Sequence, residues 1–239
     1  MPERWENLTV DGQAIRAFSA APEGSGPFPA VVVAMHAGGV DTFIQEMTRR
    51  LGAAGYLAIA PDLYHRQEPG GDNLGRMGRL RDNEIIRDVN STVEFLQGNS
   101  VVRADSIGIT GFCMGGRVVF LMAAVNQAVK AAVPFYGGNT MVPWGEAPTP
   151  FERLANTYCP VLGFFGEEDG NPSPEDMRKL DAELTRHGRA HEFHSYPGAG
   201  HAYMDFTNPN RYRQQAADAS WPIALAFFEK HLAKVPAAR

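Results

Sequence analysis

The sequence Gly-Phe-Cys-Met-Gly-Gly at residues 111–116 is the most informative stretch of the chain, because it places Cys113 at the centre of a G-x-nucleophile-x-G turn. The preceding residues, Ser106–Thr110, are typical of a short buried strand, and Arg117–Val125 are typical of a largely apolar helix. A thiol in this turn lies at a helix N-terminus, where unpaired N–H groups and the helix dipole favour the nucleophilic thiolate. The alternative is a buried structural cysteine that happens to lie among glycines.

Length and composition are those of an ordinary globular protein. The chain has 239 residues, of which 44% are hydrophobic and 21% charged, and no stretch of it resembles a linker. We therefore predict a single domain over residues 1–239. A net charge of −5 without a basic cluster argues against nucleic acid and against an anionic membrane as partners. The expected partner is a small molecule.

Cysteine usage and the first residues bear on cellular location. Cys113 and Cys159 are the only cysteines, and Met1–Glu6 lack the basic and apolar regions of a signal peptide. We expect a reducing cytoplasm and no disulfide. No C-x-x-C pair, no H-E-x-x-H motif and no membrane-spanning apolar run is present, so neither structural zinc nor membrane insertion is expected. The oligomeric state is left open between monomer and homodimer.

Strands and helices alternate along most of the chain. Asp11-Gly12 separates two strand-like runs, Glu6–Val10 and Gln13–Ser19, as in a β-hairpin. Alternation after this hairpin predicts an α/β fold with a mostly parallel sheet and helices on both faces. The further strands are expected at Pro29–His36, Tyr56–Leu63, Val129–Tyr136, Pro160–Gly166 and His191–Tyr196. The further helices are expected at Thr42–Ala54, Glu84–Gln97, Pro174–His187 and Trp221–Leu232, the last with Ser220 as N-cap and Pro222 in its first turn.

Two connections are long. The polar stretch Tyr64–Asp82, which contains Pro69-Gly70-Gly71, is predicted to be a loop. The connection Gly137–Tyr158 carries Trp144 and is unusually long for a compact domain. We interpret it as a candidate lid or pocket wall.

An acid and a base follow later strands. Asp169 comes after the strand Pro160–Gly166, and His201 comes after the strand His191–Tyr196. Because the carboxyl ends of parallel strands open onto one crevice, Cys113, Asp169 and His201 can meet there. The chain order of nucleophile, acid and histidine is that of an α/β-hydrolase.

Each partner also has an ordinary structural interpretation. Asp169 could cap the helix that begins near Ser173, or be one of three solvated acids with Glu167 and Glu168. His201 could be a loop histidine bonded to the backbone. Together, in this order and at matching strand ends, the three residues favour a catalytic triad.

The chain resembles the dienelactone hydrolase family, the cysteine-dependent branch of the α/β-hydrolase fold. The resemblance spans nearly the whole chain and implies hydrolysis of esters or lactones through an acyl-cysteine intermediate, without metal or organic cofactor. It implies Cys113 as nucleophile, His201 as base and Asp169 as the carboxylate that orients it. The motifs that carry it are Gly111–Gly116, Ala60–Tyr64, Phe135–Gly138, Phe165–Asp169 and Gly198–His201.

One departure from the family pattern lies after the first central strand, where His36-Ala37-Gly38-Gly39 replaces a segment that usually carries a glutamate. Either His36 brings a second imidazole to the thiol, or the segment forms an H-x-G-G oxyanion loop as in many esterases. A third alternative is a core histidine bonded to a neighbouring strand end. The backbone N–H groups of Ala37 and Met114 are the expected oxyanion donors, each supplying roughly 3 kcal/mol of transition-state stabilisation.

A second departure concerns substrate recognition. His201 is followed by Ala-Tyr-Met-Asp, without the arginine that clamps a substrate carboxylate in the lactone-acid hydrolases. Without two forked guanidinium groups a carboxylate is held weakly, so we expect a neutral or aryl ester as substrate. Arg76, Arg79 and Arg81 could supply another clamp, or simply form a solvated face. The expected pocket or auxiliary residues are His36, Tyr136, Trp144 and Tyr203, with Phe206 as a further apolar candidate.

Three further functional interpretations stay open. A thiolate could also attack aryl phosphotriesters as a promiscuous activity. A peptidase or acyltransferase on the same fold would use the same triad. A non-catalytic binding protein would need a broken triad, and the sequence shows all three residues.

Overall fold

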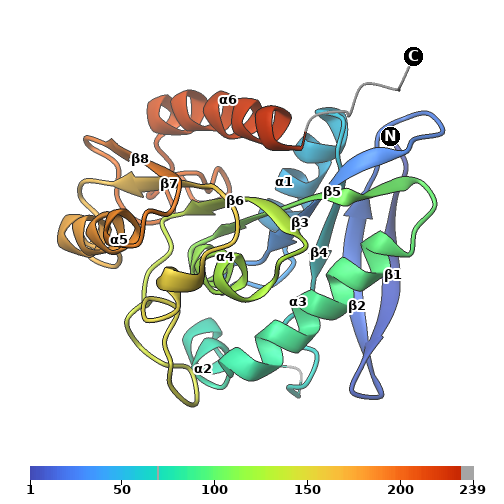
Figure 1. Cartoon of the computed structure of the whole chain (residues 1–239), viewed down its shortest axis with the longest axis horizontal. Helices are drawn as coiled ribbons and strands as arrows, with labels where there is room; N and C mark the ends of the chain where they lie inside the picture. Colours follow the sequence, from blue (N-terminus) through green and yellow to red (C-terminus); the bar gives the residue numbers. More distant parts are fainter. Residues whose placement is uncertain (69, 233–239) are drawn as a thin grey trace.

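Eight strands form one sheet in residues 1–68 and 70–232, the part of the chain that the computed structural model describes. Their order across the sheet is β1-β2-β4-β3-β5-β6-β7-β8, with β1, β2 and β4 paired antiparallel and all later neighbours paired parallel (Figure 1). The mostly parallel sheet predicted from the alternation of elements is therefore confirmed. The strands are β1 Glu3–Val10, β2 Gln13–Ala20, β3 Phe28–Ala34, β4 Leu57–Pro61, β5 Val102–Phe112, β6 Val129–Phe135, β7 Val161–Gly166 and β8 His191–Tyr196.

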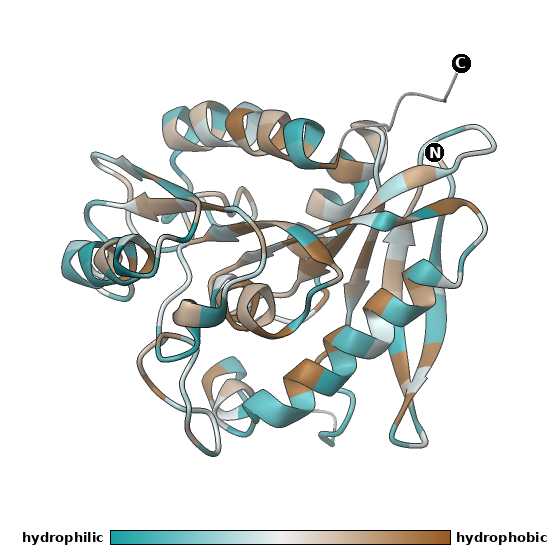
Figure 2. Cartoon of the chain, viewed as in Figure 1, coloured by the Kyte–Doolittle hydropathy of each residue, from teal (hydrophilic) through white to brown (hydrophobic). Residues whose placement is uncertain are grey.

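The central strands are covered on both faces, and their sequences reflect it. Val31–Ala34 in β3 are fully buried, as are Ile107 and Ile109 in β5. Since both faces of these strands need apolar side chains, the sequence shows continuous apolar runs instead of alternation. Figure 2 shows the same pattern, with hydrophobic central strands and hydrophilic outer helix surfaces.

Helices cover both faces of the sheet. Helices α1 and α6 lie on one face, and α3, α4 and α5 lie on the other (Figure 1). Among the residues that the structure describes, no helix is both long enough and apolar enough to cross a membrane. The helices are α1 Thr42–Ala53, α2 Asn73–Gly78, α3 Asp82–Gln97, α4 Met114–Val125, α5 Pro174–Arg186 and α6 Gln214–His231, with a short 3₁₀ turn at Leu154–Asn156.

The N-terminal hairpin is confirmed. Strands β1 and β2 pair in register from Val10 opposite Gln13 to Glu3 opposite Ala20, so β1 begins three residues before the prediction. Asp11 and Gly12 connect them with φ values of 51° and 74°. Positive φ at both central residues of a two-residue loop matches the right-handed twist of the strands.

Helix α6 begins earlier than predicted. The predicted start, with Ser220 as N-cap and Pro222 in the first turn, is wrong, because Pro222 lies inside a helix that begins at Gln214. Ser220 is fully buried and its hydroxyl donates to the Ala217 carbonyl within the helix. Buried Ala216 and Ala217 are strong helix formers and extend the helix past a proline that removes only one internal hydrogen bond.

The predicted loop Tyr64–Asp82 contains a short helix, α2, at Asn73–Gly78. The Asp72 side chain accepts a hydrogen bond from the Gly75 N–H at 2.8 Å and so caps its first turn. None of the α2 residues is buried, so the apolar periodicity that reveals most helices is missing here. Pro69, part of the same predicted loop, lies outside the described residues.

Candidate active site

The predicted nucleophile occupies the turn between β5 and α4. Cys113 is the N-cap residue of α4 and has φ 58° and ψ −117°, a conformation that a residue with a side chain rarely adopts. Its N–H donates to the Phe135 carbonyl at 3.1 Å, and its carbonyl accepts the first hydrogen bond of α4 from the Arg117 N–H. The backbone strain is held by these flanking elements, and it exposes the half-buried thiol at the end of the sheet.

The glycines around Cys113 are required by close packing. A Cβ on Gly111 would overlap the carbonyl of Gly115, and one on Gly116 would lie 2.7 Å from the Gly137 Cα. The turn therefore leaves no room beside the nucleophile, and α4 packs directly against the segment that follows β6.

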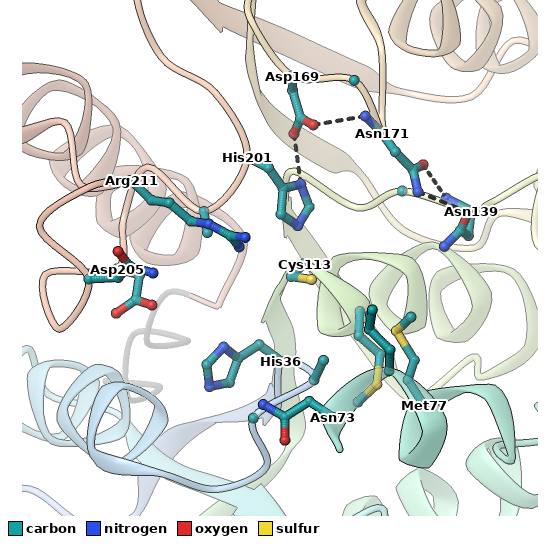
Figure 3. Close-up of a pocket in the computed structure, with 18 of the residues that line it drawn as sticks. His36, Asn73, Met77, Cys113, Asn139, Asp169, Asn171, His201, Asp205 and Arg211 are labelled. Atoms are coloured by element: carbon teal, nitrogen blue, oxygen red, sulfur yellow. Dashed lines mark hydrogen bonds and ion pairs between the residues drawn. The ribbon is translucent and has the colours of Figure 1, made fainter.

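The predicted acid and base lie together beside the thiol (Figure 3). Asp169 follows β7 and is nearly fully buried, and its Oδ2 accepts a hydrogen bond of 2.8 Å from Nδ1 of His201, which follows β8. This bond leaves Nε2 of His201 free to face Cys113. Asp169 does not cap α5, because Ser173 and Asp176 form a capping box there. It is also not one of a set of solvated acids, since Glu167 and Glu168 are exposed.

The surroundings of the thiol and the imidazole shift their pKa values toward a charged pair. Burial opposes ionisation of Cys113, but the hydrogen bond and charge of His201 and the N–H groups of Met114 and Ala37 outweigh it, so the thiol pKa is lowered. Burial also disfavours the charged form of His201, yet bonds to Asp169 and Cys113 raise its pKa to about 10. Both shifts favour the ion pair of thiolate and imidazolium over the neutral pair.

The two expected oxyanion donors both face the nucleophile. The N–H groups of Ala37 and Met114 lower the pKa of the Cys113 thiol, so a carbonyl oxygen bound at this sulfur would meet the same two donors. Tyr64 fixes the loop that carries one of them, because its buried hydroxyl donates to the Ala37 carbonyl at 3.0 Å. The guanidinium of Arg76 in α2 lies 4.1 Å above the Tyr64 ring.

His36 lines the pocket, but its imidazole is hydrogen-bonded to Asp41 and not to the Cys113 thiol. Its Nε2 is 2.8 Å from Oδ2 of Asp41, the residue whose other oxygen caps α1 through the Ile44 N–H. The His36 ring also packs edge-on against Phe43. His36 therefore stabilises the loop between β3 and α1, which is the loop that carries Ala37.

A cavity of about 690 Å³ opens over Cys113. Of the expected pocket residues, His36 and Trp144 line it, and Trp144 comes from the long Gly137–Tyr158 connection interpreted above as a pocket wall. Tyr136 and Tyr203 do not line it. Both are fully buried, and Tyr136 packs its ring edge-on against the His201 ring, with 5.3 Å between centroids. Tyr136 therefore belongs behind the base and Tyr203 belongs to the core.

An asparagine pair missed by the sequence reasoning connects the acid to the pocket wall. The backbone N–H of Asn171 donates to Oδ1 of Asp169 at 2.8 Å. The side-chain nitrogen of Asn171, Nδ2, donates to Oδ1 of Asn139 at 2.9 Å (Figure 3). The Asn139 N–H in turn donates to the Asn171 side chain at 3.0 Å. The sequence offers one indication of this pair, which is that Asn139 and Asn171 each lie a few residues after the end of a strand.

Arg211 was also missed. It lies ten residues after His201 in the sequence, at the exposed mouth of the cavity, with its guanidinium directed toward His201 (Figure 3). In contrast, none of Arg76, Arg79 and Arg81 lines the cavity. Within the described part of the chain, no three His, Cys, Asp or Glu side chains are grouped as metal ligands would be.

A mostly parallel eight-stranded sheet, a strained strand-to-helix turn and a histidine and carboxylate after later strands define the α/β-hydrolase class. The model of the Dienelactone hydrolase family matches residues 15–232, and the chain belongs to this family of ester and lactone hydrolases. This confirms the resemblance drawn from the motifs.

Known relatives agree with this assignment. A Methylorubrum extorquens protein assigned as a carboxymethylenebutenolidase is 32% identical over 94% of this chain and 79% of its own length. An Escherichia coli K12 protein with the same assignment is 32% identical over 94% of this chain and 86% of its length.

Solved structures share the fold. A Klebsiella pneumoniae protein described as a dienelactone hydrolase superposes with a TM-score of 0.87 at 29% identity, over 96% of this chain and 98% of that one. A dienelactone hydrolase-like promiscuous phosphotriesterase from metagenomic libraries superposes with a TM-score of 0.83 at 22% identity, with the same coverage.

Proposed function

We propose that this protein hydrolyses small esters or lactones through an acyl-cysteine intermediate, with Cys113 as nucleophile, His201 as acid and base, and Asp169 as its orienting carboxylate. The observation that carries the proposal is the placement of Cys113 and His201 beneath an open cavity, with a 2.8 Å bond from His201 to the buried carboxylate of Asp169. The pKa shifts of Cys113 and His201 support it, because both favour the charged pair. Family membership favours an ester or a lactone as the bond that is cleaved.

The proposed cycle begins when the Cys113 thiolate attacks the acyl carbon and a C–S bond forms. The carbonyl oxygen becomes an oxyanion held by the N–H groups of Ala37 and Met114, each supplying roughly 3 kcal/mol. His201 gives its Nε2 proton to the leaving alkoxide as the C–O bond breaks, which yields the acyl-enzyme. His201 then takes a proton from water, whose oxygen attacks the acyl carbon, and the acid and the thiolate are released.

The charge at the cavity favours a neutral or aryl ester. Arg211 is one guanidinium at an exposed position, and a single exposed charge holds a carboxylate weakly compared with a buried pair of forked contacts. We expect Arg211→Gln to change kcat/KM for a neutral aryl ester by less than about fivefold, since an exposed charge contributes at most about 1 kcal/mol. A marked preference of the wild type for carboxylated lactones, lost in Arg211→Gln, would contradict this assignment.

A second candidate activity is hydrolysis of aryl phosphotriesters. In such a reaction the thiolate attacks phosphorus, the phosphoryl oxygen takes the place of the oxyanion, and His201 protonates the departing aryl oxide. Water then cleaves the P–S bond. The observation that favours it is the likeness of this fold to that of the metagenomic phosphotriesterase.

The test uses the two cysteines as a matched pair. Cys159 is buried and burial raises its pKa to about 12, so it stays a thiol and is unreactive. Cys113→Ala is expected to abolish steady-state turnover of an aryl ester together with any burst of aryl alcohol, whereas Cys159→Ala keeps both. Normal turnover by Cys113→Ala would reject the proposal.

The remaining alternatives are separated by two further measurements. Product analysis with added amine or alcohol acceptors, and with peptides, distinguishes an acyltransferase or peptidase from a hydrolase. Rapid alkylation of Cys113 that substrate slows supports catalysis, whereas an inert thiol indicates a binding protein.

A further inference from the structure

One wall of the cavity is apolar and lies away from the base. Leu74 and Met77 of α2 and Trp144 line it. Figure 3 shows Met77 and the neighbouring Asn73 on the side of Cys113 opposite His201. This wall and the base therefore flank the nucleophile from two directions.

The apolar side chains of this wall differ in exposure, with Met77 and Trp144 only partly buried. Leu74 is 71% exposed, on a helix that buries none of its residues. A single exposed leucine needs no explanation, but here an apolar leucine, a methionine and a tryptophan share one cavity with the nucleophile. An apolar ligand group in the cavity would remove all three from water.

Trp144 is held in place by a buried ion pair. The fully buried Arg117 binds both carboxylate oxygens of Asp82, and its guanidinium carbon lies 4.0 Å from the centre of the Trp144 ring. Asp82 also hydrogen-bonds to the Trp144 backbone. Its carboxylate accepts the Trp144 N–H at 3.2 Å, and its backbone N–H donates to the Trp144 carbonyl at 2.7 Å. The ring is thus fixed before any ligand enters, which lowers the entropy lost on binding.

The position of the base determines which part of an ester meets this wall. His201 must reach the leaving oxygen to protonate it, so the alcohol portion lies on the His201 side of Cys113. The acyl group is attached to the same carbon on another side, and the cavity wall on the side of Cys113 opposite His201 is the one that α2 supplies.

We propose that Leu74, Met77 and Trp144 form a subsite for an apolar acyl group, aliphatic or aromatic, so that the preferred substrates are esters of apolar acids longer than acetate. The proposal rests on the acyl-cysteine mechanism given above. A cavity of about 690 Å³ is large enough for such a group beside the reacting ester.

The experiment varies the acyl group and the leaving group of the ester independently. Acetate and hexanoate esters of 4-nitrophenol and of methanol are compared in the wild type, in a Leu74→Asn/Met77→Gln double variant and in a Val142→Asn control. Val142 is also apolar and 50% exposed, on the neighbouring loop, but does not line the cavity. Thermal unfolding of each protein confirms folding.

The expected result is a fall of roughly tenfold in the hexanoate-to-acetate ratio of kcat/KM in the double variant, equal for both alcohols, with the ratio kept in Val142→Asn. An unchanged ratio in the folded double variant overturns the subsite. A loss that follows the alcohol instead of the acyl group also overturns it. Failure of the mechanism itself would be seen separately, as turnover of the acetate ester by Cys113→Ala.

Discussion

Replacing Asp169 by asparagine removes the negative charge beside His201 but keeps a side chain of the same size. It should therefore change the pKa values of His201 and Cys113 without moving the two residues apart. The rise of the His201 pKa from 6.5 to about 10 corresponds to roughly 5 kcal/mol in favour of the imidazolium, shared between Asp169 and Cys113. An adjacent buried carboxylate accounts for about 1–3 pKa units of such a shift. Asp169→Asn should therefore lower the His201 pKa by about two units, and the weaker imidazolium should raise the thiol pKa by about one.

The pH dependence of kcat/KM and of Cys113 alkylation measures both shifts. In the wild type the thiolate persists below the ordinary thiol pKa of 9.0, so the acid limb lies below pH 9, and activity falls again near pH 10 as His201 loses its proton. In Asp169→Asn the acid limb should move to higher pH and the basic limb to lower pH, which narrows the profile. The exposed Glu168→Gln removes one charge next to Asp169 in the sequence and is the control. Coincident profiles for Asp169→Asn and the wild type would refute the coupling.

Three other variants test parts of the site. Tyr64→Phe should lower kcat/KM roughly fivefold and the thermal midpoint by no more than about 4 °C, because the lost bond to the Ala37 carbonyl costs about 1 kcal/mol. An unchanged rate would remove Tyr64 from the site. Arg117→Met should lower the free energy of unfolding in urea by about 3–5 kcal/mol, since Asp82 is left buried and unpaired; a loss below about 1 kcal/mol would contradict this. His36→Gln should leave the acid limb of the pH profile in place, and a shifted limb would indicate a second imidazole at the thiol.

The parts of the fold that the sequence predicted well share a strong local signal. Buried on both faces, the central strands need continuous β-branched runs such as Val31–Val33, and the hairpin needs positive φ at Asp11-Gly12. Helix α2 has no buried face and left no periodicity to find. Pro222 indicates a helix start in the sequence, but the predicted start of α6 is wrong because buried alanines before the proline sustain the helix.

In the site, residues fixed by strand ends were predictable and residues fixed by packing were not. Asp169 and His201 follow parallel strands whose carboxyl ends meet, so their encounter with Cys113 could be inferred from topology. Tyr136 and Tyr203 were wrongly placed in the pocket, because an aromatic side chain near a strand end looks the same in sequence whether it faces the cavity or the core. The single domain over residues 1–239, the cytoplasmic location and the monomer or homodimer stay predictions.

The ion pair that fixes the pocket wall holds its loop almost entirely by the main chain. Arg117 donates to the backbone carbonyls of Asn139 and Val142, and Asp82 hydrogen-bonds to the backbone N–H and carbonyl of Trp144. Of the side chains in this loop, only the Trp144 indole contacts the ion pair, where it stacks on Arg117. Hydrogen bonds to the backbone do not depend on the loop's own side chains, so the loop should keep its conformation when those side chains change. Libraries that randomise exposed positions of this loop whose side chains take no part in the ion-pair contacts, such as Val142, should therefore retain folded proteins at high frequency with Cys113 left untouched.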